Sequence, residues 1–533
     1  MVDILLKECM RNGILLDLEF RDLMNHLSDE NILKLVKAIS NSGLSNKILN
    51  KNIFIKNIDE IRTNLLKSNN KNSVSKILSK ILYNEIAPLG DEAFVNNTML
   101  KPKVKNVNVL SSPAFTKRKI TVREFTRHFK SRYEKIRNIL EEKNLENLTS
   151  IRKIGYSKGN YTIIVAVLDK KITKNKNILL EVEDLTGASK VLINSSKTEL
   201  FSVGKSILED DIISINVNGG GDILFANSVI YPDASIGCKK YSNEEDLIAF
   251  ISDMHIGSKM FLEENFLKFI KWLNGEEGSG DQKELAKKIK YLFIAGDAVD
   301  GVNHGPGQEK YLNIKTTAGQ YKKLEELLSL IRRDVQIIMC PGQHDAVWVG
   351  EPQPIINKKF APGLYDLENL HLVPNPSLVE VAEFSVLMYH GASINYFINE
   401  LPEIRVKYKH DAPTKVVREM LKRRHLAPFH GLADYIPCEE DSLVIDNIPD
   451  ILFTGDQHRA EFSTVNNILL ISGSCWQSIT PFEEKAGNNP DPCKVPIFNP
   501  KTREIRILDF GNTEEGIKEE NGSKNRDDSE DLG

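Results

Sequence analysis

Six short, largely apolar runs recur in the second half of the chain, and each ends abruptly in glycine or in polar residues. The runs are residues 247–251, 291–295, 335–340, 385–389, 450–454 and 468–472. Runs of this length and character predict strands that are buried on both faces, as in the parallel sheets of α/β proteins. Functional residues of such sheets lie beyond the carboxyl ends of the strands. The residues that follow each run are therefore the first candidates for a site.

Five of the six runs lead into carboxylate, imidazole or amide side chains. The segments that follow them are Asp253-Met-His255, Gly296-Asp297-Ala-Val-Asp300, Gly342-Gln343-His344-Asp345, His390-Gly391 and Gly455-Asp456-Gln-His458. Side chains two residues apart on a strand, such as Asp253 and His255, point to the same side. Carboxylate oxygens and imidazole nitrogens that converge are ligands of divalent metal ions. The repetition at five strand ends favours a metal centre over buried polar groups that merely satisfy one another.

The first 90 residues show the 3.6-residue period of helices instead. After Ser28, which suits the N-cap position, apolar residues recur at helical spacing as far as Ile39. Spacers rich in Asn and Lys, such as residues 68–73, separate the helical stretches. We therefore expect a small helical accessory domain over residues 1–90, with no residues that suggest catalysis.

Residues 91–147 form a basic stretch of low apolar content, which we expect to be a linker. Between residues 101 and 140 there are twelve Lys or Arg and two Glu, and Lys117, Arg118 and Lys119 are consecutive. Two interpretations stay open. The stretch is either a solvated linker followed by a helix with charged faces, or an arm that neutralises nucleic-acid phosphates and releases their counterions.

Residues 148–235 change to the two-residue period of strands. The β-rich runs are residues 161–167, 178–183 and 190–194. We expect about five short strands that close into a small barrel, with a spacing that resembles an OB-fold. Such barrels bind single strands through aromatic side chains, but Tyr161, Phe201 and Phe225 are widely spaced here. A barrel that faces a protein partner is therefore favoured over one that binds DNA directly.

Residues 231–246 lead into the body of the protein, which we expect to extend over residues 247–510. Within it, residues 396–449 look like an insertion before the last metal-type motif, and Lys415 to His425 predict a basic helix capped near Thr414. The cations of this helix are Lys415, Arg418, Lys422, Arg423 and Arg424. A nucleic-acid backbone contacting these cations is one interpretation, and a merely solvated helix is the other.

Composition narrows the class of protein. Among the 533 residues, 41% are hydrophobic and 27% charged, as in soluble globular proteins, and the net charge is −4. No apolar run is long enough to span a membrane, the first residues lack the form of a signal peptide, and the six cysteines show no Cys-x-x-Cys pair. We expect reduced thiols in a multidomain cytoplasmic protein. The tail, residues 511–533, has eight acidic and three basic residues and is expected to be disordered.

The order of the motifs, Asp-x-His, Gly-Asp-x-x-Asp, Gly-x-His-Asp, His-Gly and Gly-x-x-His, resembles that of the calcineurin-like metallophosphoesterases, α/β enzymes with a β-sandwich flanked by helices. The resemblance implies two divalent ions about 3.5–4 Å apart. The implied ligands are Asp253, His255 and His458 for one ion, Gln343, His390 and Asp456 for the other, and Asp297 as a bridge between both.

The resemblance also implies three roles outside the ligand set. His344 would protonate the leaving oxygen, while Asp300 and Asp345 would orient neighbouring groups. The chain departs from the superfamily at Gln343, where asparagine is usual, and at Asp456, where histidine is usual. An aspartate makes the second ion site harder and more negative, which favours manganese or magnesium over zinc.

Further motifs resemble the small subunit of the archaeal family D DNA polymerase. They are Pro341-Gly-Gln-His-Asp-Ala346, Glu351-Pro-Gln-Pro354, Tyr389-His-Gly-Ala-Ser393, Arg424-His-Leu-Ala-Pro428, Pro449-Asp-Ile-Leu-Phe453 and Ser474-Cys-Trp-Gln477. The resemblance implies a metal-dependent 3′-to-5′ exonuclease that proofreads single-stranded DNA ends. It also implies a large subunit that supplies DNA-directed DNA polymerase (transferase) activity for DNA replication, in a heterodimer or higher assembly. A sliding clamp stays open as a partner, since no clamp-binding peptide is evident in the tail.

Two other functions compete with this one. A scaffold subunit whose phosphoesterase domain has lost its metals is disfavoured by the intact aspartate and histidine motifs. A free phosphatase or phosphodiesterase is disfavoured by the barrel, the basic helix and the motifs shared with the polymerase subunits.

Overall fold

A computed structural model describes residues 107–115, 120–155, 158–305, 307–511 and 517–520, together with short pieces between residues 9 and 64. The chain forms two compact units, which are described separately. The first comprises Met1–Asn96 and Thr116–Arg118, and the second comprises Asn97–Phe115 and Lys119–Gly533.

The described part of the first unit contains one helix and two very short strands. Helix α3 (Asp29–Ser40) begins directly after Ser28, as predicted, and buries Leu35 and Val36. Strands β1 (Leu15–Leu16) and β2 (Ile48–Leu49) pair in parallel, which the prediction of an all-helical domain did not include. The remaining helices predicted for residues 1–90, and the spacer at residues 68–73, lie outside the described residues.

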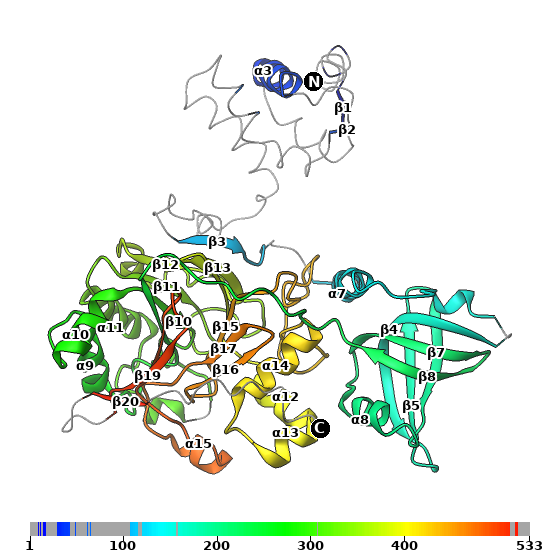
Figure 1. Cartoon of the computed structure of the whole chain (residues 1–533). Coiled ribbons are helices and arrows are strands. Elements are labelled where there is room, and N and C mark those ends of the chain that lie inside the picture. The colour runs from blue at the N-terminus through cyan, green and yellow to red at the C-terminus, as the bar shows by residue number, and fades with distance from the viewer. Residues whose placement is uncertain are drawn as a thin grey trace. The chain divides into compact units, whose positions relative to one another are not determined.

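A closed five-stranded barrel occupies residues 159–230 of the second unit (Figure 1). Its strands are β4 (Gly159–Ile172), β5 (Ile178–Asp184), β6 (Gly187–Ile193), β7 (Ile212–Gly220) and β8 (Ile223–Ile230), in the order β4-β5-β6-β8-β7. A short 3-10 helix (Ile151–Lys153) precedes it, and α8 (Thr198–Ser206) joins β6 to β7. Alternate β4 residues such as Ile163 and Val165 fill the interior, so the two-residue period of the sequence predicted this barrel correctly.

The body of the second unit is a sandwich of two mixed sheets. One has the order β12-β11-β10-β9-β18-β19-β20, with bounds Leu370–Leu372, Gln336–Cys340, Ile289–Ala295, Leu247–Ile251, Lys494–Phe498, Ile505–Asp509 and Lys518–Glu520. The other has the order β16-β17-β15-β14-β13-β3, with bounds Glu461–Val465, Ile468–Ser472, Ile451–Thr454, Phe384–Tyr389, Ser377–Val381 and Asn108–Ser111. All six apolar runs of the sequence are strands of these sheets, as predicted.

The strands that carry the polar motifs run in parallel within each sheet. In the first sheet β10 lies between β9 and β11, and in the second β15 lies between β14 and β17. Aromatic side chains join the two sheets: the ring of Phe293 lies 5.6 Å from that of Phe250, which lies 4.9 Å from Phe453 of the other sheet. The carboxyl ends of both parallel sets face the same end of the sandwich, because residues that follow strands of both sheets come together there.

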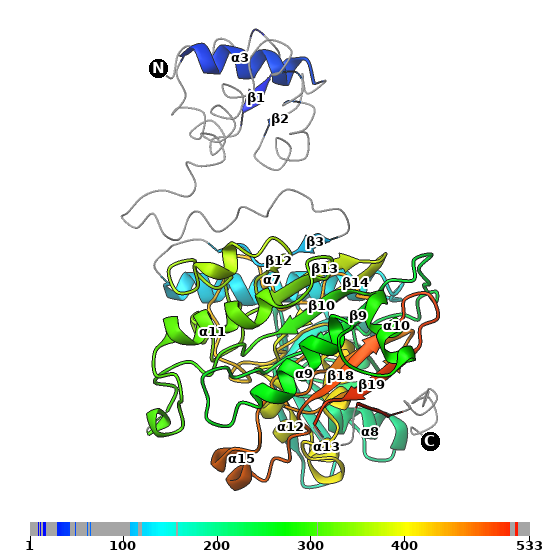
Figure 2. The same cartoon turned by 90° about the vertical axis from the view of Figure 1, so that its left-hand side faces the viewer.

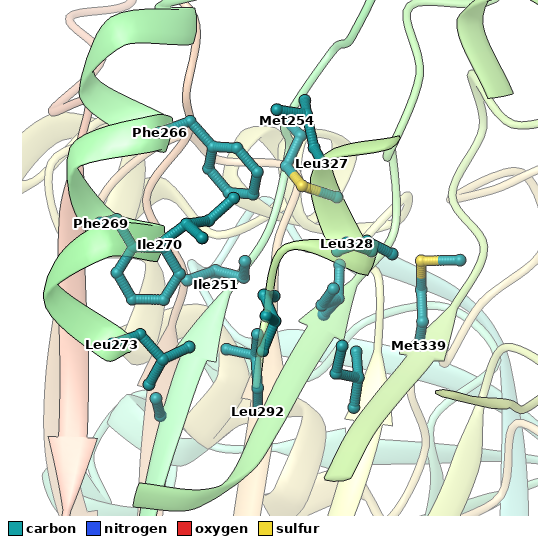
Figure 3. Close-up of a cluster of buried hydrophobic side chains, with 14 of the residues drawn as sticks. Ile251, Met254, Phe266, Phe269, Ile270, Leu273, Leu292, Leu327, Leu328 and Met339 are labelled. Atoms are coloured by element: carbon teal, nitrogen blue, oxygen red, sulfur yellow. The ribbon is translucent and has the colours of Figure 1, made fainter. Parts of the chain in front are cut away.

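Helices cover the outer faces of both sheets, as the sandwich prediction required. Helices α9 (Glu263–Leu273), α10 (Gly280–Lys288) and α11 (Thr317–Ser329) lie on the first sheet (Figure 2). Figure 3 shows Phe266, Phe269 and Ile270 of α9 pointing toward Ile251 and Leu292 of the strands. Burial of each such side chain contributes about 1.5–3 kcal/mol. Short helices η3 (Gln308–Lys310) and η4 (Gly363–Tyr365) lie in the loops.

Helices α12 (Ile394–Glu400), α13 (Pro402–Lys407) and α14 (Pro413–Arg423) cover the second sheet. They belong to the segment interpreted as an insertion, and they form the crossover connection that the parallel neighbours β14 and β15 require. The cap predicted near Thr414 is wrong. Helix α14 is preceded by Ala412, and the Thr414 N–H donates to Glu461 (2.8 Å).

The stretch predicted to be a basic linker is built into the second unit where it is described. Strand β3 pairs with β13, and helix α7 (Val122–Glu141) packs on the body and the barrel. The Arg132 guanidinium donates to buried Asp441 (2.7 Å), and the Tyr133 hydroxyl donates to the Ile164 carbonyl of β4 (2.8 Å). Residues 91–106 and the consecutive cations at 117–119 lie outside the described residues.

Three further predictions can be compared with the structure. The predicted disorder of the tail is wrong at Lys518–Glu520, which pair with β19, and residues 512–516 and 521–533 lie outside the described residues. The six cysteines, all of which lie in the described part of the chain, form no disulfide. None of the helices in the described part of the chain combines the length and the apolar character that crossing a bilayer requires.

Candidate metal centre

The polar motifs of five strands meet at one end of the sandwich. Three groups of side chains have potential ligand atoms within 4.8 Å of one another. They are Asp253, His255 and His458 (the first group); Asp253, Asp297 and His390 (the second group); and His255, Asp297 and His344. Both sheets contribute, since Asp253, Asp297 and His344 follow strands of the first sheet and His390 and His458 follow strands of the second. The sequence predicted this convergence.

Five of the candidate ligands have a left-handed backbone. Their φ angles are 52° at Asp253, 50° at His255, 47° at Asp297, 66° at Asp456 and 53° at His458. This conformation costs a residue with a Cβ atom roughly 1–2 kcal/mol. Contacts between the loops enforce it: the Asp253 and His255 N–H groups donate to the Gly296 and Asp297 carbonyls (3.1 and 3.0 Å). Such clustered strain is typical of a functional site.

Two glycines allow the loops to approach this closely. A Cβ at Gly342 would overlap the Asp297 carboxylate, and a Cβ at Gly296 would overlap the His390 ring. Side chains at these positions would therefore force Asp297 and His390 out of the centre.

Two imidazoles face each other in the first group. His255 Nε2 lies 3.2 Å from His458 Nε2, which lies 3.5 Å from Asp253 Oδ1. The Nδ1 atoms are held from behind, His255 by Asp300 (3.2 Å) and His458 by Glu483 (2.7 Å). In the tautomer that has its proton on Nδ1, facing the carboxylate, each ring has a lone pair on Nε2, and the two lone pairs then point toward each other. Two lone pairs at this distance repel unless a cation lies near both, so the donor set fits a metal ion.

The second group centres on His390, which is fully buried. Its Nε2 lies 3.3 Å from Asp297 Oδ2 and 3.9 Å from Asp456 Oδ1, and its Nδ1–H donates to the Ala295 carbonyl (2.8 Å). Asp297 Oδ2 also lies 4.0 Å from His255 Nε2, so this carboxylate stands between the two groups. Asp456 Oδ2 accepts hydrogen bonds from the amides of Asn395 (3.0 Å) and Gln457 (2.8 Å).

Gln343, the remaining implied ligand, is half-buried in the loop after β11. Both of its neighbours approach Asp297: the His344 N–H donates to Asp297 Oδ1 (2.8 Å), and Gly342 lies against the same carboxylate. The loop is thus held at the centre on either side of Gln343.

The pKa values of the Asp297 and Asp456 carboxylates are shifted in opposite directions. Burial alone would raise the pKa of Asp297, but the imidazoles of His390, His344 and His255 hold it well below its ordinary value. Burial raises the pKa of Asp456 to about 6, and the nearby charges of Asp253 and Asp297 add to this effect although His390 opposes it. The cluster thus concentrates negative charge that divalent cations would compensate.

His344 lies beside the first group. Its Nδ1 is 2.9 Å from the Asp300 carbonyl, which assigns the proton to Nδ1 and leaves Nε2 to exchange a proton with another molecule. The ring of His304, a residue that the sequence analysis did not single out, stacks on it with a centroid distance of 4.6 Å. A single histidine in an exposed Gly-rich loop gave no signal of this contact.

The two residues predicted to orient their neighbours, Asp300 and Asp345, contact the loops of the centre. Asp300 contacts His255 Nδ1 and accepts from the Gln308 amide (3.0 Å). Asp345 accepts from the Gly342 N–H (2.9 Å) and the Tyr321 hydroxyl (3.0 Å), and burial raises its pKa to about 6.

Glu483 was missed. Its segment, Thr480-Pro-Phe-Glu483, is readable as a capping box for α15 (Pro481–Ala486), but nothing in that signal points to a histidine 25 residues earlier. Burial would raise its pKa, yet its hydrogen bonds with His458 and Thr480 lower it to about 2.

Two of the five cations proposed to contact DNA are unavailable for that role. Arg423 and Arg424 are 3% and 5% exposed. Arg423 donates to Asp211 of the barrel (2.8 Å), and Arg424 donates to the Ile445 carbonyl (2.7 Å). The interpretation of both as DNA contacts is therefore wrong, because they join α14 to the barrel and to its own crossover segment.

The other three cations lie at half-buried positions on α14. The Lys422 ammonium lies 4.4 Å from the centre of the Tyr231 ring and 3.5 Å from Glu419, and Lys415 lies 5.8 Å from the centre of the Tyr408 ring. Lys422 thus also contributes to the contact with the barrel, whereas Lys415 and Arg418 keep the predicted placement on the basic helix.

Comparisons with known proteins show which proteins this chain is similar to. Residues 248–464 match the DNA polymerase alpha/epsilon B-subunit family. The DNA polymerase II small subunit of Methanothermobacter thermautotrophicus is 35% identical over 386 residues, 72% of this chain and 78% of that protein. That of Archaeoglobus fulgidus is 35% identical over 391 residues, 73% of this chain and 78% of that protein. A structure of Yfce, a phosphoesterase from E. coli, is 13% identical with a TM-score of 0.24, covering 52% of this chain and 98% of that one.

The similarity to the relatives extends well beyond the metal motifs, since it covers more than two thirds of the chain at 35% identity. The resemblance drawn from the sequence motifs is thereby confirmed. The chain belongs to the family of archaeal DNA polymerase II small subunits.

Proposed function

We propose that this chain is the 3′-to-5′ exonuclease of a two-subunit DNA polymerase, and that it removes nucleotides from single-stranded 3′ ends with two divalent ions. The observation that carries the proposal is the position of Asp297 between two groups of candidate ligands, 3.3 Å from His390 and 4.0 Å from His255. Sites built this way serve in-line displacement at phosphorus.

The residues would divide between the ions as the motifs imply. The first ion would be held by Asp253, His255 and His458, the second by Gln343, His390 and Asp456, and both by Asp297. Bound divalent ions polarise a phosphodiester and lower the pKa of a bound water to near neutrality. The carboxylate at Asp456 supports manganese or magnesium at the second site.

His344 acts on the leaving group. Because its Nδ1 is engaged by the Asp300 carbonyl, Nε2 is the atom that donates a proton to the departing 3′ oxygen. Its backbone N–H holds Asp297, so the acid and the bridging carboxylate keep a fixed relation. The products are a 5′-nucleotide and a shortened strand.

The large polymerase subunit is the proposed protein partner. The strand order of the barrel supports an OB-fold over residues 148–235. On its outer surface Ile223 and Phe225 of β8 are 43% and 51% exposed, which supports a protein-facing role. The phosphoesterase domain, residues 247–510, would then work beside that subunit.

Single-stranded DNA would approach across α13 and α14. Asp411, between these helices, forms an ion pair with Arg459 (3.3 Å), the residue after His458. The Tyr408 ring lies 4.9 Å from the Lys407 ammonium on the same turn. The ion pair joins the segment between α13 and α14 to a metal-site loop. The basic and aromatic groups of that segment, with Lys415 and Arg418 of α14, support this path for the DNA.

Incubation of the purified chain with Mn²⁺ and a 5′-labelled single-stranded oligonucleotide tests the proposal. A ladder of shortened, still-labelled products is expected from the wild type and not from Asp297→Ala, with little release of phosphate from a small phosphomonoester. If the wild type gives no ladder with any divalent ion and only the double variant Gln343→Asn/Asp456→His gives one, the natural chain is a scaffold and the proposal is wrong.

A further inference from the structure

Glu483 uses its two carboxylate oxygens for different purposes. Oε2 accepts from the Thr480 N–H and hydroxyl (both 2.8 Å) and so caps α15. Oε1 accepts from His458 Nδ1 (2.7 Å). The side chain is largely buried, so the second bond is shielded from water. The cap alone would not require the bond to His458.

The three histidines proposed as ligands differ in the group that contacts Nδ1. His255 is backed by the Asp300 carboxylate (3.2 Å) and His458 by the Glu483 carboxylate (2.7 Å). His390 is backed by the neutral Ala295 carbonyl (2.8 Å). Both imidazoles of the first group are therefore carboxylate-backed, and the imidazole of the second group is not.

We propose that Glu483 is a positioning residue of the metal centre, and that its hydrogen bond with His458 makes the site of Asp253, His255 and His458 the tighter of the two ion sites. The inference rests on the proposed function. A carboxylate behind a histidine fixes the tautomer that offers Nε2 to the metal and increases the basicity of that nitrogen, whereas a carbonyl gives the first effect with less of the second.

Two substitutions separate this role from that of the helix cap. Glu483→Gln keeps a capping-box residue at its position, since glutamine serves there as well as glutamate. If the amide oxygen stays with Thr480, the amide NH₂ meets the Nδ1–H of His458, donor against donor. Thr480→Ala does the reverse, because it removes the hydroxyl that caps Glu483 N–H and leaves the carboxylate on His458.

Titration of the full chain with Mn²⁺, followed by electron paramagnetic resonance, tests the inference. The wild type should bind two ions, one more tightly. Glu483→Gln should weaken the tight site about 10–100-fold and leave the weak site unchanged, while Thr480→Ala should lower the melting temperature without changing either affinity. If Glu483→Gln folds poorly by circular dichroism, Glu483→Ala with added formate replaces it, and formate should restore the tight site.

The outcomes are distinguishable. A wild-type affinity in Glu483→Gln, or an equal loss of affinity in Thr480→Ala, would overturn the role of Glu483 while leaving the two-ion centre intact. A wild-type chain that binds no Mn²⁺ would overturn the proposed function itself.

Discussion

Substitution of Glu351 tests how much an ionised, buried carboxyl near the centre destabilises the folded chain. Its side chain is fully buried and accepts from the Tyr389 hydroxyl (2.9 Å) and the Asn375 amide (3.4 Å). Asn375 in turn accepts from the His390 N–H (3.0 Å). Burial raises the pKa of Glu351 from 4.5 to about 7, although the bonds with Tyr389 and Asn375 oppose this. Glu351→Gln removes the charge and keeps the size.

The expected magnitude follows from that pKa. Because the pKa is higher in the folded chain than in the unfolded chain, the contribution of this group to stability is fully present below pH 4.5 and is lost as the pH rises through about 7. At pH 8 the ionised group costs the folded state about 3 kcal/mol. The glutamine can satisfy both neighbours, since its NH₂ can donate to the Tyr389 oxygen while that hydroxyl donates to Ser393 (2.9 Å).

Urea denaturation at pH 5 and pH 8 measures the effect. Glu351→Gln should raise the free energy of unfolding by about 3 kcal/mol at pH 8 and by less than about 1 kcal/mol at pH 5. The matched control is Glu368→Gln, whose side chain is 85% exposed, and which should change stability little at either pH. A Glu351→Gln protein that is less stable than the wild type at pH 8 would refute the reasoning.

Three other predictions concern the centre, acid stability and assembly. Asp297→Ala should lose bound Mn²⁺, whereas His344→Ala should retain it by metal analysis and lose about 10²–10⁴ in nuclease rate. Neutral His425 accepts from the Ala427 N–H and donates to Asp441 (2.9 and 3.0 Å), and burial lowers its pKa to about 4. The free energy of unfolding, measured by urea denaturation, should therefore fall by up to about 3 kcal/mol as the pH is lowered from 6.5 toward 4. In His425→Gln the free energy of unfolding should depend less on pH over this range. Removal of residues 1–96 should leave co-purification with the large subunit intact.

The sandwich and its site were predictable because their signals are local. Each buried strand is an apolar run, and each ligand follows its strand directly, so the parallel order brings Asp253, Asp297 and His390 together. The reason given for the convergence of Asp253 and His255, the alternation of side chains along a strand, was only partly right. Asp253 and His255 follow β9 in left-handed turns, so their shared direction comes from the loop and not from the alternation of an extended strand.

The remaining features depend on contacts between distant segments. Arg423 and Arg424 read as surface cations because a helix sequence does not reveal that the barrel will bury Arg423 against Asp211. Glu483 reads as a helix cap because its second partner, His458, lies on another element. The stretch before the barrel reads as a linker because Asp441, which binds Arg132, is 309 residues away.

The central claim is that the strand ends build a two-ion centre with Asp297 as the bridge. Anomalous diffraction from crystals soaked in Mn²⁺ measures it directly. Two peaks about 3.5–4 Å apart are predicted, one beside Asp253, His255 and His458 and the other beside His390 and Asp456, with Asp297 contacting both. A single peak, or two peaks that do not share Asp297, would contradict it.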